Sequence, residues 1–340
     1  MDRTTEALVN ETLCGDRRSL ARLISLVEKD RSVRSQVMRH LYPRAGRAHY
    51  VGLTGPPGGG KSTLVAGLTS IARANGAKVG VVAVDPTSPY SGGALLGDRV
   101  RMQEHHVDDG VFIRSMATRG DAGGLSQVAT DVARIIGASG KDMVMVETVG
   151  VGQNEADTSQ IVDTTIVVTV PESGDYVQLM KAGLMETADV VVVNKADHAG
   201  ADQMIAQLAS MLCESRTEHA WWRVHVVATQ AANGQGVDEL YWHVRGHLDA
   251  LERSGELARR RSQQRMKELG CILEESLLCA VKEAMEEDDG FNPCLEKVAQ
   301  GELDPYAAAA EVLGSPGLLQ RCLQRAGKCR DMGAQSLRED

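Results

Sequence analysis

The chain has 340 residues, of which 43% are hydrophobic, so it can build a buried core for one large domain or two smaller ones. Its net charge of -9 argues against a nucleic-acid partner held by broad neutralisation of phosphates. No apolar run reaches the roughly 18 to 20 residues that cross a bilayer, so we expect no membrane partner. The start of the chain lacks the apolar core of a signal peptide and is too acidic for a mitochondrial presequence, so we expect a cytoplasmic protein.

Residues 1–46 are predicted to form a helical N-terminal extension. Apolar residues recur at helical intervals from about Thr5 to Arg39, and the pattern ends near Pro43 and Gly46, two residue types that stop helices. A short apolar run follows, so we expect a second domain to start at residue 47.

Residues 47–237 show short β-branched runs that alternate with helical stretches, a pattern typical of stacked βαβ units. Several runs are apolar almost throughout, as expected of strands that helices cover on both faces. We therefore predict an α/β fold of the P-loop NTPase type with a mostly parallel central sheet. The predicted strands are Tyr50–Thr54, Val79–Val84, Val111–Ser115, Met143–Val146, Thr165–Val170, Val190–Val193 and Val224–Ala228.

The first of these strands leads into GPPGGGKST, Gly55–Thr63, which matches the phosphate-binding pattern G-x-x-x-x-G-K-[ST]. Its glycines let successive backbone N–H groups turn towards phosphate oxygens, while Lys61 adds positive charge and Ser62 a hydroxyl for Mg2+. A helical pattern follows at once, which places the loop at a strand-to-helix turn. The predicted nucleotide-binding residues of this loop are Gly55, Pro57, Gly58, Gly59, Gly60, Lys61, Ser62 and Thr63.

Three carboxylates are candidates for the magnesium site, together with the hydroxyl of Ser62. Asp85 and Glu147 each follow a predicted strand, and Asp98 ends the glycine-rich segment after Asp85. Mg2+ prefers oxygen ligands and takes few of them from protein, which fits such a set. The alternative is that each carboxylate only caps a loop, and for Asp98 the two interpretations are equally balanced.

The segment Glu147-Thr148-Val149-Gly150 is similar to the D-x-x-G switch of GTPases, in which the N–H of the glycine, here Gly150, meets the γ-phosphate. Ras-type enzymes place a glutamine next, and that glutamine orients the attacking water, whereas this chain has Val151. Valine can neither orient water nor transfer a proton. We therefore expect slow intrinsic hydrolysis that a partner or a mobile loop completes.

Two further segments predict that the bound base is guanine. Asn194-Lys195-Ala196-Asp197 follows a predicted strand, at the edge of the sheet where ligands bind. Asp197 can accept hydrogen bonds from guanine N1 and N2. The stem of Lys195 can lie along the base, and Asn194 can join neighbouring loops. Adenine lacks that pair of donors, so the site disfavours ATP. Gln230-Ala231 follows the last strand and is the expected source of a backbone N–H for guanine O6, although it could be an ordinary loop.

Residues 238–340 are predicted to form a C-terminal helical region. From Asp238 to about Asp288 the sequence is long, charged and helical, with Gly246, Gly255 and Gly270 as expected breaks. Further on, Asp304-Pro305 has the form of a helix cap followed by proline at the first helical position.

From about Leu20 to Leu313 the chain resembles the MeaB/MMAA family of P-loop GTPases, which includes the ArgK-type proteins. The motifs that carry the resemblance are GPPGGGKST at Gly55–Thr63, VDPTSPYSGGALLGDRVRM at Val84–Met102, ETVGVGQNE at Glu147–Glu155, GDYVQLMKAGLMETAD at Gly174–Asp189 and NKAD at Asn194–Asp197. Two features depart from the family pattern. Gln230 stands where many relatives have serine, and the segment after Leu313 looks like an extension.

The resemblance implies a GTPase that serves as a chaperone of adenosylcobalamin-dependent acyl-CoA mutases, chiefly methylmalonyl-CoA mutase, by assisting cofactor loading and protecting the mutase from inactivation. It also implies a homodimer formed by the long C-terminal helices, with Asp238–Asp288 as the candidate segment, although a solvated helical lid is the alternative there. The catalytic set would be Lys61, Asp85, Asp98, Glu147 and Lys181. Asp175, Gln178 and Lys181 would form a third switch that rearranges on mutase binding, although a surface helix start with a solvated lysine is the alternative there.

Two other functions stay open at this point. A metallochaperone GTPase would deliver a metal to another metalloenzyme and would need Cys or His ligands near the switches, where only His105-His106 offers a pair. An ATP-dependent kinase of a transport system is the second alternative, and Asn194 with Asp197 argues against it because the pair favours guanine.

Overall fold

The computed structural model describes residues 1–85, 105, 107–117, 127–148, 161–171, 184–214, 221–287 and 290–328. Its centre is a seven-stranded sheet of order β3-β2-β4-β1-β5-β6-β7, and the paired strands are parallel throughout. This arrangement confirms the predicted α/β fold. The strands are β1 (His49–Thr54), β2 (Val79–Asp85), β3 (Val111–Ala117), β4 (Met143–Glu147), β5 (Thr164–Thr169), β6 (Val190–Asn194) and β7 (His225–Thr229), each within two residues of its predicted bounds.

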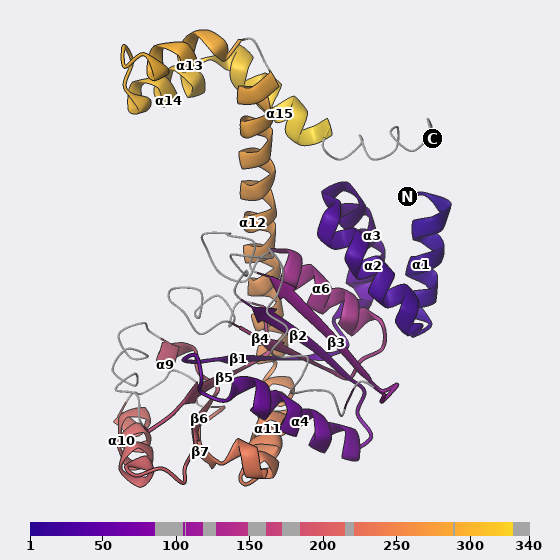
Figure 1. Ribbon diagram of the computed structural model, residues 1–340, viewed down its shortest axis with the longest axis vertical. Helices are drawn as coiled ribbons and strands as arrows, with labels where there is room; N and C mark the ends of the chain where they lie inside the picture. The colour runs from indigo at the N-terminus through magenta and orange to yellow at the C-terminus, as the bar shows by residue number, and fades with distance from the viewer. Residues whose placement is uncertain are drawn as a thin grey trace.

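Helices cover both faces of the sheet (Figure 1), which explains why the strands are apolar almost throughout. α4 (Lys61–Ala74) and α11 (Val237–Ser254) pack on one face, and α6 (Gln127–Ala138) and α10 (Ala201–Glu214) pack on the other. The four consecutive valines of β6 alternate between these two cores, and all four are fully buried.

The N-terminal extension consists of α1 (Arg3–Leu13), α2 (Arg17–Lys29) and α3 (Arg31–Ala45), whose apolar faces join the core beside α6. The side chains of Asp2, Asp16 and Asp30 cap the three helices by accepting backbone N–H bonds. Pro43 does not end α3, which runs on to Ala45. A proline this close to the end of a helix removes only one hydrogen bond, so the last turn survives.

The C-terminal region is helical, as predicted, but its breaks differ. Gly255 adopts a left-handed φ of 77° and separates α11 from α12 (Glu256–Glu287), whereas Gly246 and Gly270 lie inside these helices. The expected breaks at Gly246 and Gly270 are therefore wrong, because a glycine costs a helix only about 1 kcal/mol when no proline or left-handed turn adds to it. α13 (Asn292–Ala299), α14 (Pro305–Gly314), which Asp304 caps as expected, and α15 (Pro316–Lys328) follow.

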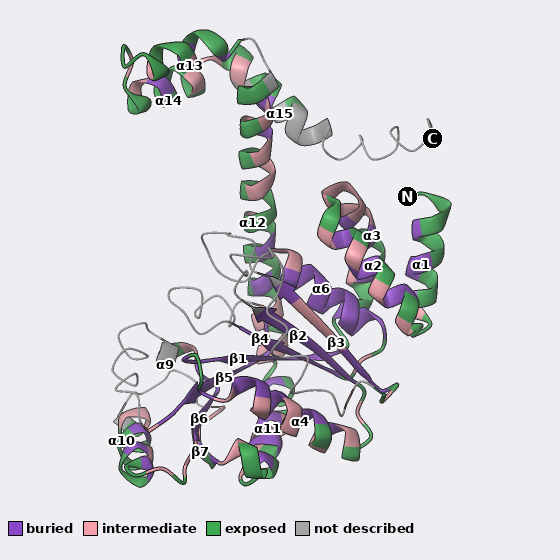
Figure 2. Cartoon of the chain, viewed as in Figure 1, coloured by how far each residue is buried: buried purple, intermediate pink, exposed green. Residues whose placement is uncertain are grey.

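α12 is 32 residues long and extends away from the sheet, with α13, α14 and α15 at its far end (Figure 1). Along much of its length its residues are exposed or half-buried (Figure 2). A small separate core around Ala284, Phe291 and Cys322 holds the far helices to it. None of the described helices combines the length and the apolar character that a membrane span requires.

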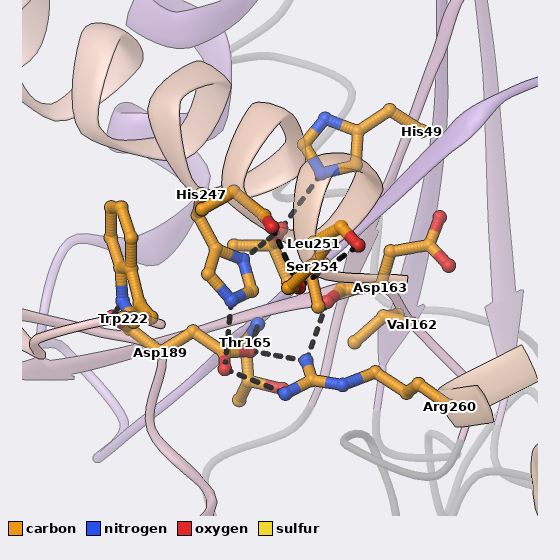
Figure 3. Close-up of polar contacts among 12 residues, drawn as sticks. His49, Val162, Asp163, Thr165, Asp189, Trp222, His247, Leu251, Ser254 and Arg260 are labelled. Atoms are coloured by element: carbon orange, nitrogen blue, oxygen red, sulfur yellow. Dashed lines mark hydrogen bonds and ion pairs between the residues drawn. The ribbon is translucent and has the colours of Figure 1, made fainter. Parts of the chain in front are cut away.

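The first turns of α12, together with α11, contact the edge of the sheet where the parallel strands begin (Figure 3). Arg260 donates to Asp189, which directly precedes β6, at 2.8 and 2.9 Å. Arg261 donates to Asp163, which directly precedes β5, at 2.8 and 2.6 Å. These paired bonds fix the C-terminal helices to the starts of two central strands.

His49, the first residue of β1, belongs to the same buried cluster. Its Nε2 lies 2.7 Å from Thr164 Oγ1, and the same hydroxyl lies 2.8 Å from Nδ1 of His247 on α11. A hydroxyl has one hydrogen, so Thr164 donates to one imidazole and accepts from the other. Burial lowers the pKa of His49 to about 3, and the imidazole is therefore neutral at physiological pH.

The buried neutral His49 predicts a loss of stability in acid. The folded pKa is lowered to about 3 from 6.5, so between these values the unfolded chain binds a proton that the folded chain does not. The free energy of unfolding should therefore fall as the pH decreases from about 6.5 towards about 3. Urea unfolding across this range should show a weaker pH dependence for His49→Gln than for the wild type.

His40, an exposed histidine of α3, provides the control. His40→Gln should keep the wild-type pH dependence, because the side chain it removes is not buried. Equal slopes for His49→Gln and the wild type would show that His49 does not resist protonation.

Candidate functional site

The phosphate-binding loop joins β1 to α4 at the carboxyl edge of the sheet, as predicted. Gly55 adopts a φ of 140°, and a Cβ built there would lie 2.1 Å from the carbonyl oxygen of Val168, so no other residue fits. Lys61 is buried, and its Nζ donates to the carbonyls of Gly55 at 2.8 Å and Pro56 at 3.0 Å. The lysine is therefore held inside the loop that is expected to bind phosphate.

Ser62 and Glu147 come together beside this loop. Ser62 at the start of α4 donates its hydroxyl to Glu147 Oε1 at 2.6 Å, and both residues are buried. β2, which ends at Asp85, pairs with β4, which ends at Glu147. A hydroxyl and a carboxylate in contact form the oxygen-rich donor set that Mg2+ prefers, so these residues fit a magnesium ion.

Asn194 connects three loops at the end of β6. Its Nδ2 donates to the carbonyl of Gly59 in the phosphate-binding loop at 2.8 Å, and its Oδ1 accepts from Thr229 Oγ1 and from the N–H of Ala231, both at 3.0 Å. The side chain is almost fully buried, with 2% exposure. The structure thus brings the phosphate-binding loop and the expected base-binding loops together through one amide.

A cavity of about 270 Å3 lies between these loops, and its lining includes Thr63, Lys195, Asp197, Gln230 and Ala231. The side chain of Asp197 is 53% exposed at this cavity, so its carboxylate can accept hydrogen bonds from a ligand. Lys195 adopts a left-handed φ of 56°, a conformation that costs a non-glycine residue about 1 to 2 kcal/mol. The neighbouring N–H of Ala196 donates to Thr229 O at 3.0 Å, which helps to hold the turn in this conformation.

The backbone N–H groups of Gln230 and Ala231 already have partners within the protein. Gln230 donates to the carbonyl of Gln235 at 3.0 Å, and Ala231 donates to Asn194. A contact of the Ala231 amide with guanine O6 would therefore be shared with Asn194. That contact stays a prediction.

Several predicted site residues lie outside the part of the chain that the structure describes. They are Asp98, Gly150 and the third-switch residues Asp175, Gln178 and Lys181, and the side chain of Asp85 is likewise outside it.

The fold agrees with what comparison with known proteins shows. A family model described as methylmalonyl Co-A mutase-associated GTPase MeaB matches residues 20–286. The chain belongs to the MeaB family. A Pyrococcus horikoshii protein provisionally named a GTPase is 47% identical over 310 residues, which cover 91% of this chain and 97% of the relative.

Other relatives connect this MeaB-family GTPase to named proteins. GTPase ArgK of Escherichia coli is 36% identical over 273 residues, which cover 78% of this chain and 82% of ArgK. The mitochondrial methylmalonic aciduria type A homolog of Mus musculus is 32% identical over 324 residues, which cover 90% of this chain and 78% of the relative. A solved structure described as a LAO/AO transport system kinase has a TM-score of 0.68 and 26% identity, and covers 95% of this chain and 99% of its own.

One residue of this site was missed by sequence reasoning. Thr229, the last residue of β7, is buried and uses its hydroxyl to orient the amide of Asn194. A threonine at the end of a β-branched strand gives no signal of its own. Its position directly before Gln230-Ala231, in a loop already expected to meet the base, was the only available indication.

Asn194→Ala should weaken the binding of both GTP and GDP by at least about tenfold, because Gly59, Thr229 and Ala231 would all lose a buried hydrogen-bond partner. Titration calorimetry measures this directly. Asn75→Ala, at the opposite end of α4 from the phosphate-binding loop, should leave the affinity unchanged. Unaltered binding by a folded Asn194→Ala protein would show that the three loops do not need this connection.

Proposed function

We propose that this MeaB-family GTPase is a chaperone that uses GTP hydrolysis to assist cofactor loading and protection of an adenosylcobalamin-dependent acyl-CoA mutase, with methylmalonyl-CoA mutase as its partner. The observation that carries the proposal is the match of residues 20–286 to the family described as methylmalonyl Co-A mutase-associated. The connected phosphate and base loops support the GTP-dependent part.

In the proposed site, the amides of the glycine loop bind the phosphates and Lys61 moves from the carbonyls of Gly55 and Pro56 to a phosphate oxygen. Ser62 and Glu147, with Asp85 and Asp98, would hold Mg2+ or its waters, and the N–H of Gly150 would meet the γ-phosphate. Bound Mg2+ supplies neutralisation of the charge that develops on the phosphates. Asp197 accepts from guanine N1 and N2, beside Lys195 and Ala231.

The metal assignment predicts a changed Mg2+ requirement for Ser62→Ala. Loss of the hydroxyl removes an oxygen ligand, so the Mg2+ concentration for half-maximal GTP hydrolysis should rise by at least about tenfold. Ser70→Ala, on the exposed side of the same helix, is the matched control and should behave as wild type. An unchanged Mg2+ titration for Ser62→Ala would exclude this hydroxyl as a ligand.

Hydrolysis in this protein should be slow without its partner, because Val151 occupies the position where Ras-type enzymes have a water-orienting glutamine. We propose that Asp175, Gln178 and Lys181 form a switch that the mutase rearranges. Lys181 would then place its positive charge near the developing phosphate charge.

Candidate mutases added to the protein should therefore increase GTP turnover, and methylmalonyl-CoA mutase should do so most. Lys61→Ala should abolish nucleotide binding, whereas Lys181→Ala should keep basal hydrolysis and lose only the stimulated part. Equal loss of basal and stimulated turnover for Lys181→Ala would show that the third switch is wrongly assigned. Failure of every cobalamin-dependent acyl-CoA mutase to stimulate turnover would contradict the chaperone function.

We also propose that α12 forms a homodimer with a second copy of this chain. Large apolar side chains recur along the helix and stay exposed, namely Met266 at 67%, Leu269 at 48%, Leu273 at 50%, Leu277 at 43% and Leu278 at 56%. A row of this length on a helix matches a second helix rather than water. Light scattering should give a dimer for the wild type, and Leu273→Glu should shift it to a monomer.

The alternative of metal delivery receives no support from the described residues. Nε2 of His105 lies 3.2 Å from both Ser70 Oγ and the carbonyl of Ala66, so the ring is engaged with α4. Within the described ranges, no three His, Cys, Asp or Glu side chains are grouped as a metal site. A zinc or nickel titration that saturates at stoichiometric metal would favour metal delivery. A competition assay in which ATP displaces GTP would favour the ATP-dependent kinase of a transport system.

A further inference from the structure

β6 is held at both of its ends by buried polar side chains. Asp189 precedes its first residue, and Asn194 is its last residue. The Asp189 carboxylate accepts two bonds from Arg260, one from the N–H of Thr165 at 2.8 Å, and lies 3.2 Å from Nε2 of His247. Burial alone would raise the pKa of Asp189, but the contacts with His247 and Arg260 lower it well below its usual range. The carboxylate is therefore a fully engaged anion.

Between these ends β6 is closely packed and is paired with β5 and β7. Its four valines are fully buried, alternately in the two cores of the sheet. Five residues in extended conformation span about 17 Å. Because close-packed interiors resist local compression, a shift of Asp189 along the strand axis moves Asn194 as well.

Two arrangements in this cluster could suggest other roles for Asp189. Asp189, His247 and Thr164 have the composition of a catalytic triad, but Thr164 has 0% exposure and its hydroxyl is bound by His49 as well, so no substrate reaches it. A cavity of about 610 Å3 lies beside Asp189 and Arg260, with Trp221 and Trp222 in its lining. This space would allow Asp189 to turn towards water if the arginine were lost.

We propose that Arg260 is a positioning residue for guanine recognition: its two bonds to Asp189 fix β6 along its axis and thereby set Asn194 and Asp197 relative to the phosphate-binding loop. The inference rests on the proposed binding of guanine by Asp197. Loss of Arg260 leaves a buried anion that moves towards the neighbouring cavity and displaces β6. Guanine then loses its aligned carboxylate, whereas the phosphates keep the glycine loop.

Arg261 provides a matched comparison because it is the next residue of α12 and forms a similar pair with a buried aspartate. Asp163 precedes β5, and its carboxylate also accepts from the N–H of Tyr50 in β1. β1 leads to the phosphate-binding loop and β5 leads to residue 171, so neither strand ends at the Asn194–Asp197 loop. Loss of Arg261 should destabilise the protein without a specific effect on the base.

The test compares hydrolysis of GTP and ITP, since ITP lacks the 2-amino group that Asp197 is proposed to bind. Arg260→Met should lower the ratio of kcat/KM for GTP to that for ITP by at least roughly fivefold, through KM for GTP. Arg260→Lys, which restores one bond to Asp189, should recover part of the ratio. Arg261→Met should leave the ratio unchanged even if both substrates are hydrolysed more slowly. Assays are run well below the unfolding temperature of each variant.

Asp189→Asn keeps the shape of the side chain and removes its charge. This variant serves as the test if Arg260→Met does not fold, and it should lower the ratio of kcat/KM for GTP to that for ITP in the same way. An unchanged ratio for Arg260→Met or Asp189→Asn, or an equal decrease for Arg261→Met, would overturn the inference.

Asp197→Ala separates this inference from the assignment of the base site. If Asp197→Ala removes the preference for GTP but Arg260→Met does not, only the positioning role fails. If Asp197→Ala keeps the preference, the base-site assignment fails and the positioning role fails with it. The inference holds if Asp197→Ala and Arg260→Met both lower the ratio and Arg261→Met does not.

Discussion

The amide side chain of Asn194 imposes the constraint around which the nucleotide site is built. It fills the space next to Gly60, where a Cβ would lie 2.2 Å from its Nδ2. Gly60 is therefore required for two independent reasons, its left-handed φ of 87° and this contact. Because the same amide bonds to Gly59, Thr229 and Ala231, the phosphate and base loops are joined directly by hydrogen bonds.

The opposite edge of the sheet is organised in a complementary way. Asp163 directly precedes β5 and Asp189 directly precedes β6, and the consecutive arginines of α12 bind these two aspartates. Buried ion pairs of this kind add little net stability, because removing charges from water costs several kcal/mol per ion. Their value is geometric, since a bidentate arginine fixes both the distance and the direction of its partner.

Sequence reasoning predicts the central part of this protein well for a physical reason. Strands such as Val190–Val193 are buried on both faces, so their composition alone identifies them. The phosphate-binding loop is equally local, since its chemistry depends on adjacent residues. The link made by Asn194 was expected in outline, because a loop at the carboxyl edge of a parallel sheet must meet its neighbours.

Other features depend on contacts between distant residues and could not be predicted. Asp189 and Arg260 are 71 positions apart, and an arginine in a charged helical stretch has the same local pattern as a solvated one. The continuity of α12 through Gly270 was missed because glycine lowers helix stability without forbidding a helix. The hydrogen bond of the Ala231 N–H could not be predicted either, because its acceptor is the side chain of Asn194 on another strand.

The length of α12 means that one helix connects the sheet, at Arg260, with the helices at its far end. At 1.5 Å per residue, a helix of 32 residues is about 48 Å long, and Arg260 lies in its first turns. Further along, Glu268 and Glu275 of α12 pair with arginines of α6 and α3, so the helix stays attached to the body of the protein over much of its length. A molecule that binds the far helices would therefore act on the sheet and on these helices through one continuous helix. Thermodynamic linkage would make such an effect reciprocal: if binding at the far helices changes the affinity for guanine by some factor, occupancy of the guanine site changes the affinity at the far helices by the same factor.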